Sequence, residues 1–158
     1  MSDSLVPDSR EAEAYSVSLR FISYRTRSNR EVVDYLRLRR GYDQNVIDGV
    51  VARLRSADLV NDARFAASWV ADRVSLRPHS RRRLAAELYQ KGLSSDDVEV
   101  ALSGLSADDY REMLAGVAVK KRREVGYQDD QKLIAFLSRQ GYAHEDIVEA
   151  LRLAAFET

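Results

Sequence analysis

The sequence predicts an all-α protein built from tandem three-helix, helix-turn-helix-like repeats that form an elongated, curved array. Two observations predict this class. Three glycines recur at spacings of 51 and 49 residues, namely Gly41, Gly92 and Gly141. Each glycine separates two segments whose apolar residues have helical spacing. A glycine in this position is typical of a helix C-terminus, where the chain turns through a left-handed backbone conformation.

The helix expected after each glycine carries four apolar residues with the spacing i, i+3, i+4, i+7 of an amphipathic helix. These residues are Ile47, Val50, Val51 and Leu54, then Val98, Ala101, Leu102 and Leu105, then Ile147, Ala150, Leu151 and Ala154. The helix before each glycine carries two apolar residues four apart, namely Val32 and Leu36, Leu84 and Leu88, and Leu133 and Leu137. The first copy has one extra residue between its leucine and its glycine, so we expect a different turn there.

A third helix in each repeat is predicted to follow the two that flank the glycine. Asn61 or Asp62 can cap a helix that carries Phe65 and Trp69, and Ser106 with Asp109 resembles a capping box. A helix with Tyr15, Leu19 and Ile22 on one face is expected to cap the start of the array. The predicted organisation is therefore a disordered tail (1–12), an N-terminal capping helix (13–27), repeat 1 (28–77), repeat 2 (78–126) and a two-helix repeat 3 (127–158).

The composition is that of a cytoplasmic protein without a membrane span. The 158 residues are 45% hydrophobic and 32% charged, which allows a core, although a repeat array divides it into several small ones. The chain has no cysteine, no apolar run of membrane-spanning length and no signal-peptide pattern. We expect a monomer in the cytoplasm.

Groupings of residues that would indicate catalysis or metal binding are missing from the sequence. His79 and His144 lack partners at metal-ligand spacing, and no glycine-rich phosphate loop is present. Acidic neighbours such as Asp96 and Asp97 lie where a helix start favours negative charge. We therefore expect no enzyme activity, no cofactor and no metal site.

The net charge of zero conceals an uneven distribution. The segment 18–91 contains 16 basic and 8 acidic side chains, whereas 92–158 contains 8 basic and 13 acidic ones. Arginine accounts for 21 of the 25 basic residues, and its forked guanidinium suits phosphate and carboxylate groups. The first half is thus expected to attract polyanions.

The triplet Arg81, Arg82 and Arg83 is the most informative local feature of the basic half. With Ser80 as N-cap, these cations occupy the first turn of a helix and oppose its dipole, at a cost of about 0.3–1 kcal/mol each. This departure from the charge rule suggests an external partner, although a solvated arginine run is the alternative. The candidate binding residues are Arg25, Arg27, Arg30, Arg73, Arg77, Arg81, Arg82, Arg83, Lys120 and Lys121.

Some of these residues also have a purely structural interpretation. Lys120 and Lys121 lie near a helix end, where cations compensate the dipole, and the same holds for Arg37, Arg39 and Arg40. Tyr24 is interpreted as the rim of a core, with stacking on a base as the alternative.

Several short motifs together resemble the RecX family, the bacterial regulators of the RecA recombinase. They are 25–31 (RTRSNRE), 40–42 (RGY), 59–62 (LVND), 64–66 (RFA), 69–70 (WV), 91–93 (KGL), 120–121 (KK) and 140–142 (QGY). The similarity extends from about Leu19 to Leu151. Each motif is weak alone, but their order and spacing are fairly specific.

This resemblance implies a non-enzymatic protein without a cofactor that binds RecA and its nucleoprotein filament. RecX-like proteins usually inhibit ATP hydrolysis and strand exchange, and they lie in the filament groove, in contact with RecA and in some cases with DNA. The family has no catalytic residues to transfer to this chain. Two alternatives stay open from the residues alone: a helical DNA-binding protein that acts without RecA, and a protein–protein scaffold.

Overall fold

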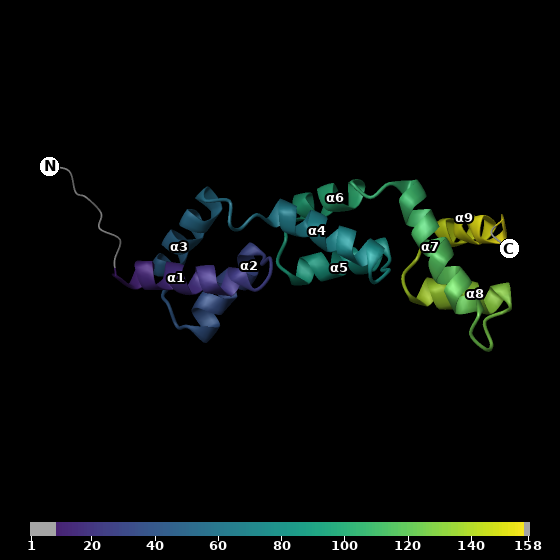
Figure 1. Cartoon of the computed structure of the whole chain (residues 1–158), viewed down its shortest axis with the longest axis horizontal. Helices are drawn as coiled ribbons and strands as arrows, with labels where there is room; N and C mark the ends of the chain where they lie inside the picture. Colours follow the sequence, from purple (N-terminus) through teal and green to yellow (C-terminus); the bar gives the residue numbers. More distant parts are fainter. Residues whose placement is uncertain (1–8, 157–158) are drawn as a thin grey trace.

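A computed structural model describes residues 9–156 of the chain, which form helices and the turns between them, with no strand in this range. The helices are α1 (Ser9–Ser23), α2 (Asn29–Asp34), the π-helical η1 (Tyr35–Arg39), α3 (Gln44–Ser56), α4 (Asp62–Ser75), α5 (Arg81–Gln90), α6 (Ser95–Ser103), α7 (Ala107–Arg122), α8 (Asp130–Arg139) and α9 (His144–Phe156). They follow one another along the long axis of the molecule, so the shape is elongated (Figure 1). None of the described helices combines the length and apolar character that crossing a membrane requires.

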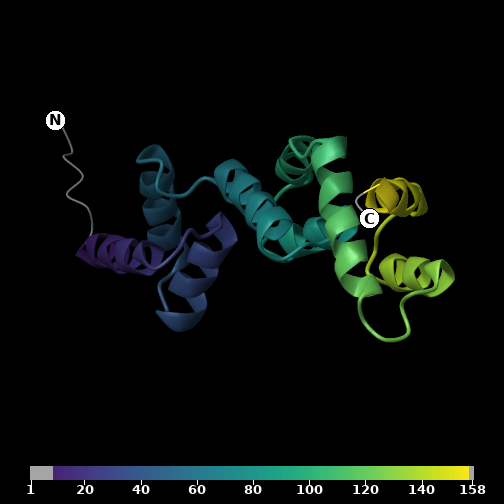
Figure 2. The same ribbon diagram turned by 45° about the vertical axis from the view of Figure 1, so that its right-hand side comes forward.

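Three separate hydrophobic cores divide the described chain into three units. Unit 1 contains α1, α2, η1 and α3, unit 2 contains α4 to α6, and unit 3 contains α7 to α9. The first and third helices of each unit pack together, as α1 does with α3, α4 with α6, and α7 with α9. When the molecule is turned, unit 1 remains a separate cluster, and α7 lies beside the helices of unit 2 (Figure 2). The fold is thus a row of three-helix units.

The grouping of helices differs from the sequence-based division by one helix. In the structure, each helix-turn-helix packs with the helix that precedes it. The sequence-based repeats 28–77 and 78–126 instead include the helix that follows. Phe65 and Val70 of α4 pack against Leu84 and Leu88 of α5, and the third unit acquires α7 as its first helix. The physical reason is that the apolar face of α4 is covered by α5 and α6 rather than by unit 1.

The N-terminal segment also differs from expectation. The helix begins at Ser9 rather than at residue 13, so part of the predicted tail is ordered, and residues 1–8 lie outside the described range. The predicted face was right in part: Tyr15 and Ile22 pack against the core of unit 1, whereas Leu19 is 39% exposed and the small residues Ala14 and Ser18 are buried. Small residues face α3 here because the two helices pack closely, and Ser18 Oγ satisfies its buried hydroxyl by donating to Ala14 O (2.8 Å).

The second and third helices of each unit form the predicted helix-turn-helix around a glycine. Gly41, Gly92 and Gly141 have φ values of 71°, 82° and 94°, which only glycine adopts cheaply. The paired apolar residues of the preceding helices, from Val32 to Leu137, are completely buried. The residue after each glycine, Tyr42, Leu93 or Tyr142, is also buried and closes the core beneath the turn.

The extra residue in the first copy is accommodated by the π-helix η1. Arg40 N donates to Tyr35 O, five residues back, and Tyr42 N donates to Leu36 O, six residues back. The equivalent bond in unit 2 spans five residues, from Leu93 N to Leu88 O. A π-turn accepts one additional residue without changing the glycine that follows. The expectation of a different first turn is therefore confirmed.

Candidate functional site

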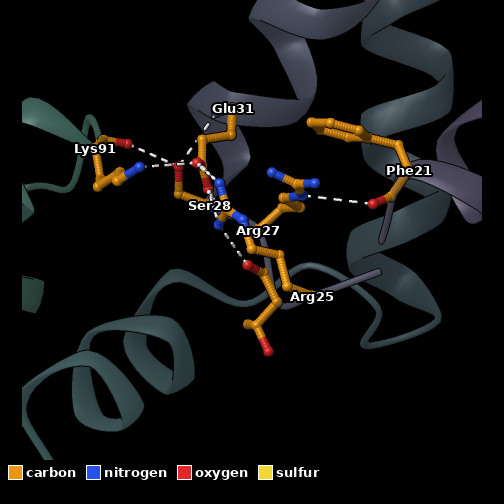
Figure 3. A network of polar contacts seen from close by, with 7 residues as sticks. Phe21, Arg25, Arg27, Ser28, Glu31 and Lys91 are labelled. Atoms are coloured by element: carbon orange, nitrogen blue, oxygen red, sulfur yellow. Dashed lines mark hydrogen bonds and ion pairs between the residues drawn. The ribbon is translucent and has the colours of Figure 1, made fainter. Parts of the chain in front are cut away.

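The boundary between units 1 and 2, here called the first junction, is held by polar contacts at the start of α2. Ser28 is the N-cap of α2, and its hydroxyl donates to Lys91 O of unit 2 (2.7 Å). Asn29 N donates to Asp62 Oδ1 at the start of α4 (2.8 Å). Lys91 Nζ in turn lies 3.0 Å from Glu31 Oε1. Figure 3 shows the contacts of Ser28, Glu31 and Lys91. The first turn of one helix thus binds the end of another helix in the next unit.

Glu31 is the acidic centre of the first junction. It accepts from Ser28 N in a capping box and from Arg25 Nη2 at 2.6 Å, in addition to Lys91. Burial raises the pKa of Glu31, but the bonds from Arg25, Ser28 and Lys91 outweigh it and leave the pKa below its ordinary value. Glu31 is therefore charged at neutral pH and attracts two cations to the junction.

A second acidic residue, Glu87 of α5, gathers cations on the adjoining part of unit 2. Trp69 Nε1 donates to Glu87 Oε2 (2.8 Å), and Arg83 Nε donates to Oε1 (3.2 Å). Arg73 Nε and His79 Nδ1 lie 3.5 and 2.8 Å from its carboxylate oxygens. Burial raises the pKa of Glu87, yet these neighbours lower it overall, and burial lowers the pKa of His79. His79 is thus neutral at physiological pH.

The indole of Trp69 lies between the cations around Glu31 and the cations around Glu87. The guanidinium of Arg73 lies 4.2 Å from its ring centroid and the ammonium of Lys91 lies 5.4 Å away, so the indole contacts cations from α4 and from the end of α5. We call the resulting surface, which is contiguous across the first junction, the basic junction surface. It comprises Arg25, Arg27, Arg30, Arg73, Arg83 and Lys91, gathered around Glu31 and Glu87.

The boundary between units 2 and 3, here called the second junction, repeats the geometry of the first. Ser80, the N-cap of α5, donates to Gln140 O (3.0 Å), just as Ser28 donates to Lys91 O. Arg81 N donates to the Tyr110 hydroxyl of α7 (3.1 Å), just as Asn29 N donates to a side chain of α4. The accepting carbonyl precedes a turn glycine each time, so equivalent residues meet at both junctions.

The arginine triplet has contacts within the chain that the sequence did not reveal. Arg81 donates to Leu102 O and Leu105 O (both 3.1 Å), which are carbonyls at and just after the end of α6, and its guanidinium lies 4.6 Å from the Tyr110 ring centroid. Arg82 lies beside Gly141, and Arg83 is paired with Glu87. The departure from the dipole rule therefore has an internal cause, because Arg81 binds the negative end of a neighbouring helix.

The other predicted binding residues lie either in or near the basic junction surface, or in unit 3. Arg25 and Arg27 belong to the basic junction surface, where the Arg27 guanidinium lies 3.9 Å from the Phe21 ring centroid and burial lowers the pKa of Arg27. Arg30 lies against Gly92, and Arg77 is exposed in the turn before α5. Lys120 and Lys121 lie far along the chain in unit 3.

Lys121 is enclosed by its own unit rather than offered to a partner. Its ammonium pairs with Glu124 at 2.5 Å and lies 4.3 and 4.4 Å from the Tyr127 and Phe136 ring centroids. Lys120, by contrast, is exposed. The pair is therefore separate from the basic junction surface.

Two aromatic residues differ from their sequence interpretation. Tyr24, expected at a core rim, is 78% exposed and stands next to Arg25. Trp69, expected in the core, packs against the core of unit 2 but is only partly buried, and cations lie over its ring. An exposed tyrosine beside arginine has the chemistry that stacks on nucleic-acid bases.

Sequence reasoning also missed the junction residues Ser28, Lys91 and Asp62. Asp62 was expected only as a helix cap, and Ser28 and Lys91 only as parts of short motifs. The available signal was positional: a serine at the start of one pre-glycine helix recurs in the next repeat, as Ser28 and Ser80 do. The contact itself joins residues 63 and 60 positions apart, which no local pattern displays.

Comparisons with known proteins agree with this architecture. The family model for the first three-helix domain of RecX matches residues 14–54, and the model for the second matches 61–102, which are units 1 and 2. A regulatory protein RecX from Mycobacterium ulcerans is 42% identical over 140 residues, covering 85% of this chain and 80% of that protein. One from Mycobacteroides abscessus is 38% identical over 152 residues, covering 93% and 74%.

Solved structures share the fold. A crystal structure of RecX from Lactobacillus salivarius has a TM-score of 0.82 at 21% identity and covers 93% of this chain and 97% of that one. Another RecX crystal structure has a TM-score of 0.75 at 23% identity, covering 87% and 69%. The class is thus that of regulatory proteins built from tandem three-helix domains. This chain belongs to the RecX family.

Proposed function

We propose that this protein modulates the RecA recombinase, acting as an inhibitor that binds RecA and RecA–DNA filaments. In this role it limits filament growth, ATP hydrolysis and strand exchange during DNA repair, recombination and the SOS response in the cytoplasm. Family membership supports a regulatory rather than an enzymatic role. The basic junction surface is the observation that connects the proposal to a site: four of its six cations pair with Glu31 or Glu87, and Arg27 and Arg30 add further positive charge.

The excess positive charge on that surface suits phosphate oxygens or acidic protein groups. Glu31 and Glu87 hold the cations in place but leave the surface positively charged overall. Arg30 and Arg83 remain exposed, and Arg77 and Tyr24 extend the area available to a partner. Arginine can bind phosphate through two parallel hydrogen bonds. Arg81 and Lys121 contribute indirectly in this scheme, because their charged groups are used within the chain.

The experiment that tests the function is RecA ATP hydrolysis on single-stranded DNA, with the protein titrated from far below to above the RecA concentration. Inhibition well below one protein per RecA is the expected result, because a protein that stops filament growth acts on many subunits. No effect at excess, with a cognate RecA of proven activity, would refute the proposal.

A charge-reversal variant tests the site. Arg77→Glu with Arg83→Glu changes two exposed cations of unit 2, and Lys120→Glu with Arg123→Glu is a matched control on exposed cations of unit 3. We expect the first variant to need at least about tenfold more protein for half-inhibition, as two lost charge contacts imply. Equal inhibition by both variants would remove this surface from the mechanism.

The same proteins separate the two alternative functions. Steep salt dependence of binding to bare DNA, with no effect on RecA, would indicate a DNA-binding protein that acts alone. Binding to RecA without binding to DNA at low salt would indicate a protein–protein scaffold.

A further inference from the structure

The turn glycines of units 2 and 3 are covered by the preceding unit, and that of unit 1 is not. A Cβ added to Gly92 would lie 2.5 Å from the Arg30 side chain, and one on Gly141 would lie 2.8 Å from Ser80 Oγ. A Cβ on Gly41 would meet nothing within 4 Å. The three turns have the same sign of φ and a buried residue after the glycine. Unit 1 therefore presents an uncovered glycine turn of the kind that the chain uses twice for docking, although a π-turn precedes it in unit 1 alone among the three described units.

The occupied turns show what this surface binds. Each receives the N-terminus of a helix whose N-cap serine donates to the carbonyl before the glycine, Lys91 O or Gln140 O. At the first junction the side chain of that same residue also pairs with the third residue of the docked helix, since Lys91 Nζ lies 3.0 Å from Glu31. A Ser-x-x-Glu helix start thus matches a turn whose residue before the glycine is a cation.

Unit 1 has the same chemistry at its exposed turn. Arg40 occupies the position of Lys91, and both Arg40 and Gly41 are exposed. The π-turn before them leaves Leu38 75% exposed between Arg37 and Arg39. The carbonyl acceptor, the cation and an apolar contact therefore lie within four residues at the free end of the array.

We propose that the Arg40–Gly41 turn, together with Leu38, is a docking site for a helix N-terminus of another protein. The docked helix carries serine or threonine at its N-cap and glutamate or aspartate three residues later. Its hydroxyl donates to Arg40 O, its carboxylate pairs with the Arg40 guanidinium, and an apolar residue covers Leu38. This site lies outside the basic junction surface and does not depend on the RecA proposal.

A second copy of this chain, stacked end to end so that its α8 meets this turn, is the wrong partner for chemical reasons. The corresponding helix start at the other end of the array is that of α8, where Asp129 is the N-cap. An aspartate carboxylate accepts hydrogen bonds but cannot donate one to Arg40 O. The residue three positions later is Lys132, which repels Arg40. End-to-end stacking of copies through this turn is therefore disfavoured. Dimerisation of the free protein through its serine-capped helix starts, Ser94 with Asp97 or Ser106 with Asp109, would overturn the proposal of a foreign helix.

Nuclear magnetic resonance of the full chain, titrated with synthetic helical peptides, tests the proposal. One peptide begins with serine at the N-cap and glutamate three residues later, and its matched control has aspartate and lysine at these positions. We expect the first peptide to shift the amide signals of Arg40, Gly41 and Tyr42, with a Kd about fivefold to tenfold lower than the control. That ratio corresponds to one hydrogen bond and one exposed ion pair.

An Arg40→Glu variant makes the test specific. It retains the backbone carbonyl but reverses the charge, so it should prefer a third peptide with serine at the N-cap and lysine three residues later. Absence of shifts at millimolar peptide, or equal affinity for the first peptide and its control, would overturn the proposal. Larger shifts of the same signals with a single-stranded oligonucleotide would also overturn it, because the turn would then be a phosphate contact.

Discussion

The two junctions share their backbone contacts and differ in their side chains. Both place an N-cap serine on the carbonyl before a turn glycine. The first junction adds a partly buried ion pair between Lys91 and Glu31, whereas the second adds Arg81, which binds neutral carbonyls beside the Tyr110 ring. Repeated contacts therefore set how units stack, while variable side chains decide how each junction responds to salt, pH and charged partners.

The largest expected effect on stability comes from glycine substitutions, which compare the turn at Gly141, covered by Ser80, with the uncovered turn at Gly41. Gly41→Ala should cost about 1–2 kcal/mol of unfolding free energy, because alanine must adopt a left-handed backbone. Gly141→Ala should cost about 2–4 kcal/mol, because its Cβ also displaces Ser80 from Gln140 O. Urea unfolding followed by circular dichroism measures both. Equal losses would mean that Ser80 moves aside without penalty.

A serine substitution isolates the junction hydrogen bond from helix capping. Ser80→Ala removes an N-cap and an inter-unit bond, so we expect a loss of about 1–3 kcal/mol. Ser106 is the N-cap of α7, and its hydroxyl accepts from Asp109 N within the same helix. Ser106→Ala should cost only the capping contribution, about 0.5–2 kcal/mol. If the two variants unfold at the same urea concentration, the junction bond contributes nothing to stability.

Acidification should weaken the first junction more than the second. The folded pKa of Glu31 lies below its unfolded value, so its stabilisation is complete above the unfolded pKa and is lost as pH falls through the folded pKa. Glu31→Gln should lower stability by about 1 kcal/mol at pH 7 and have little effect near pH 3. Thermal unfolding of both proteins from pH 7 to 3 checks this. A constant difference across that range would contradict the charge argument.

The sequence predicted the parts of the fold that depend on local chemistry. The apolar stripes, the turn glycines and caps such as Asn61 follow from neighbouring residues, and the structure confirms them. The assignment of α4 to a unit could not be predicted in this way. The segments 57–61 and 76–80 that flank α4 are both five residues long, so loop length favours neither neighbour.

The candidate site was predictable in composition but not in arrangement. Charge counting located the cations in the first half, and five of the predicted arginines belong to the basic junction surface: Arg25, Arg27, Arg30, Arg73 and Arg83. Which of them face a partner depends on contacts between units. Lys91 was expected only as part of a family turn motif, and Arg81 only as a binding residue, because their partners lie far away in sequence.

The serine contacts also bring helix dipoles into series. The positive end of α2 meets the negative end of α5, and the positive end of α5 meets the negative end of α8. The dipoles therefore compensate one another at both internal boundaries, and uncompensated partial charge remains only at the outer ends of the series. There the chain supplies opposite charges: Arg39 and Arg40 at the end of η1, and Asp129 and Asp130 at the start of α8. The dipoles of α2 with η1, α5 and α8 therefore add up as in one long helix, and charged side chains compensate the dipole at its two ends.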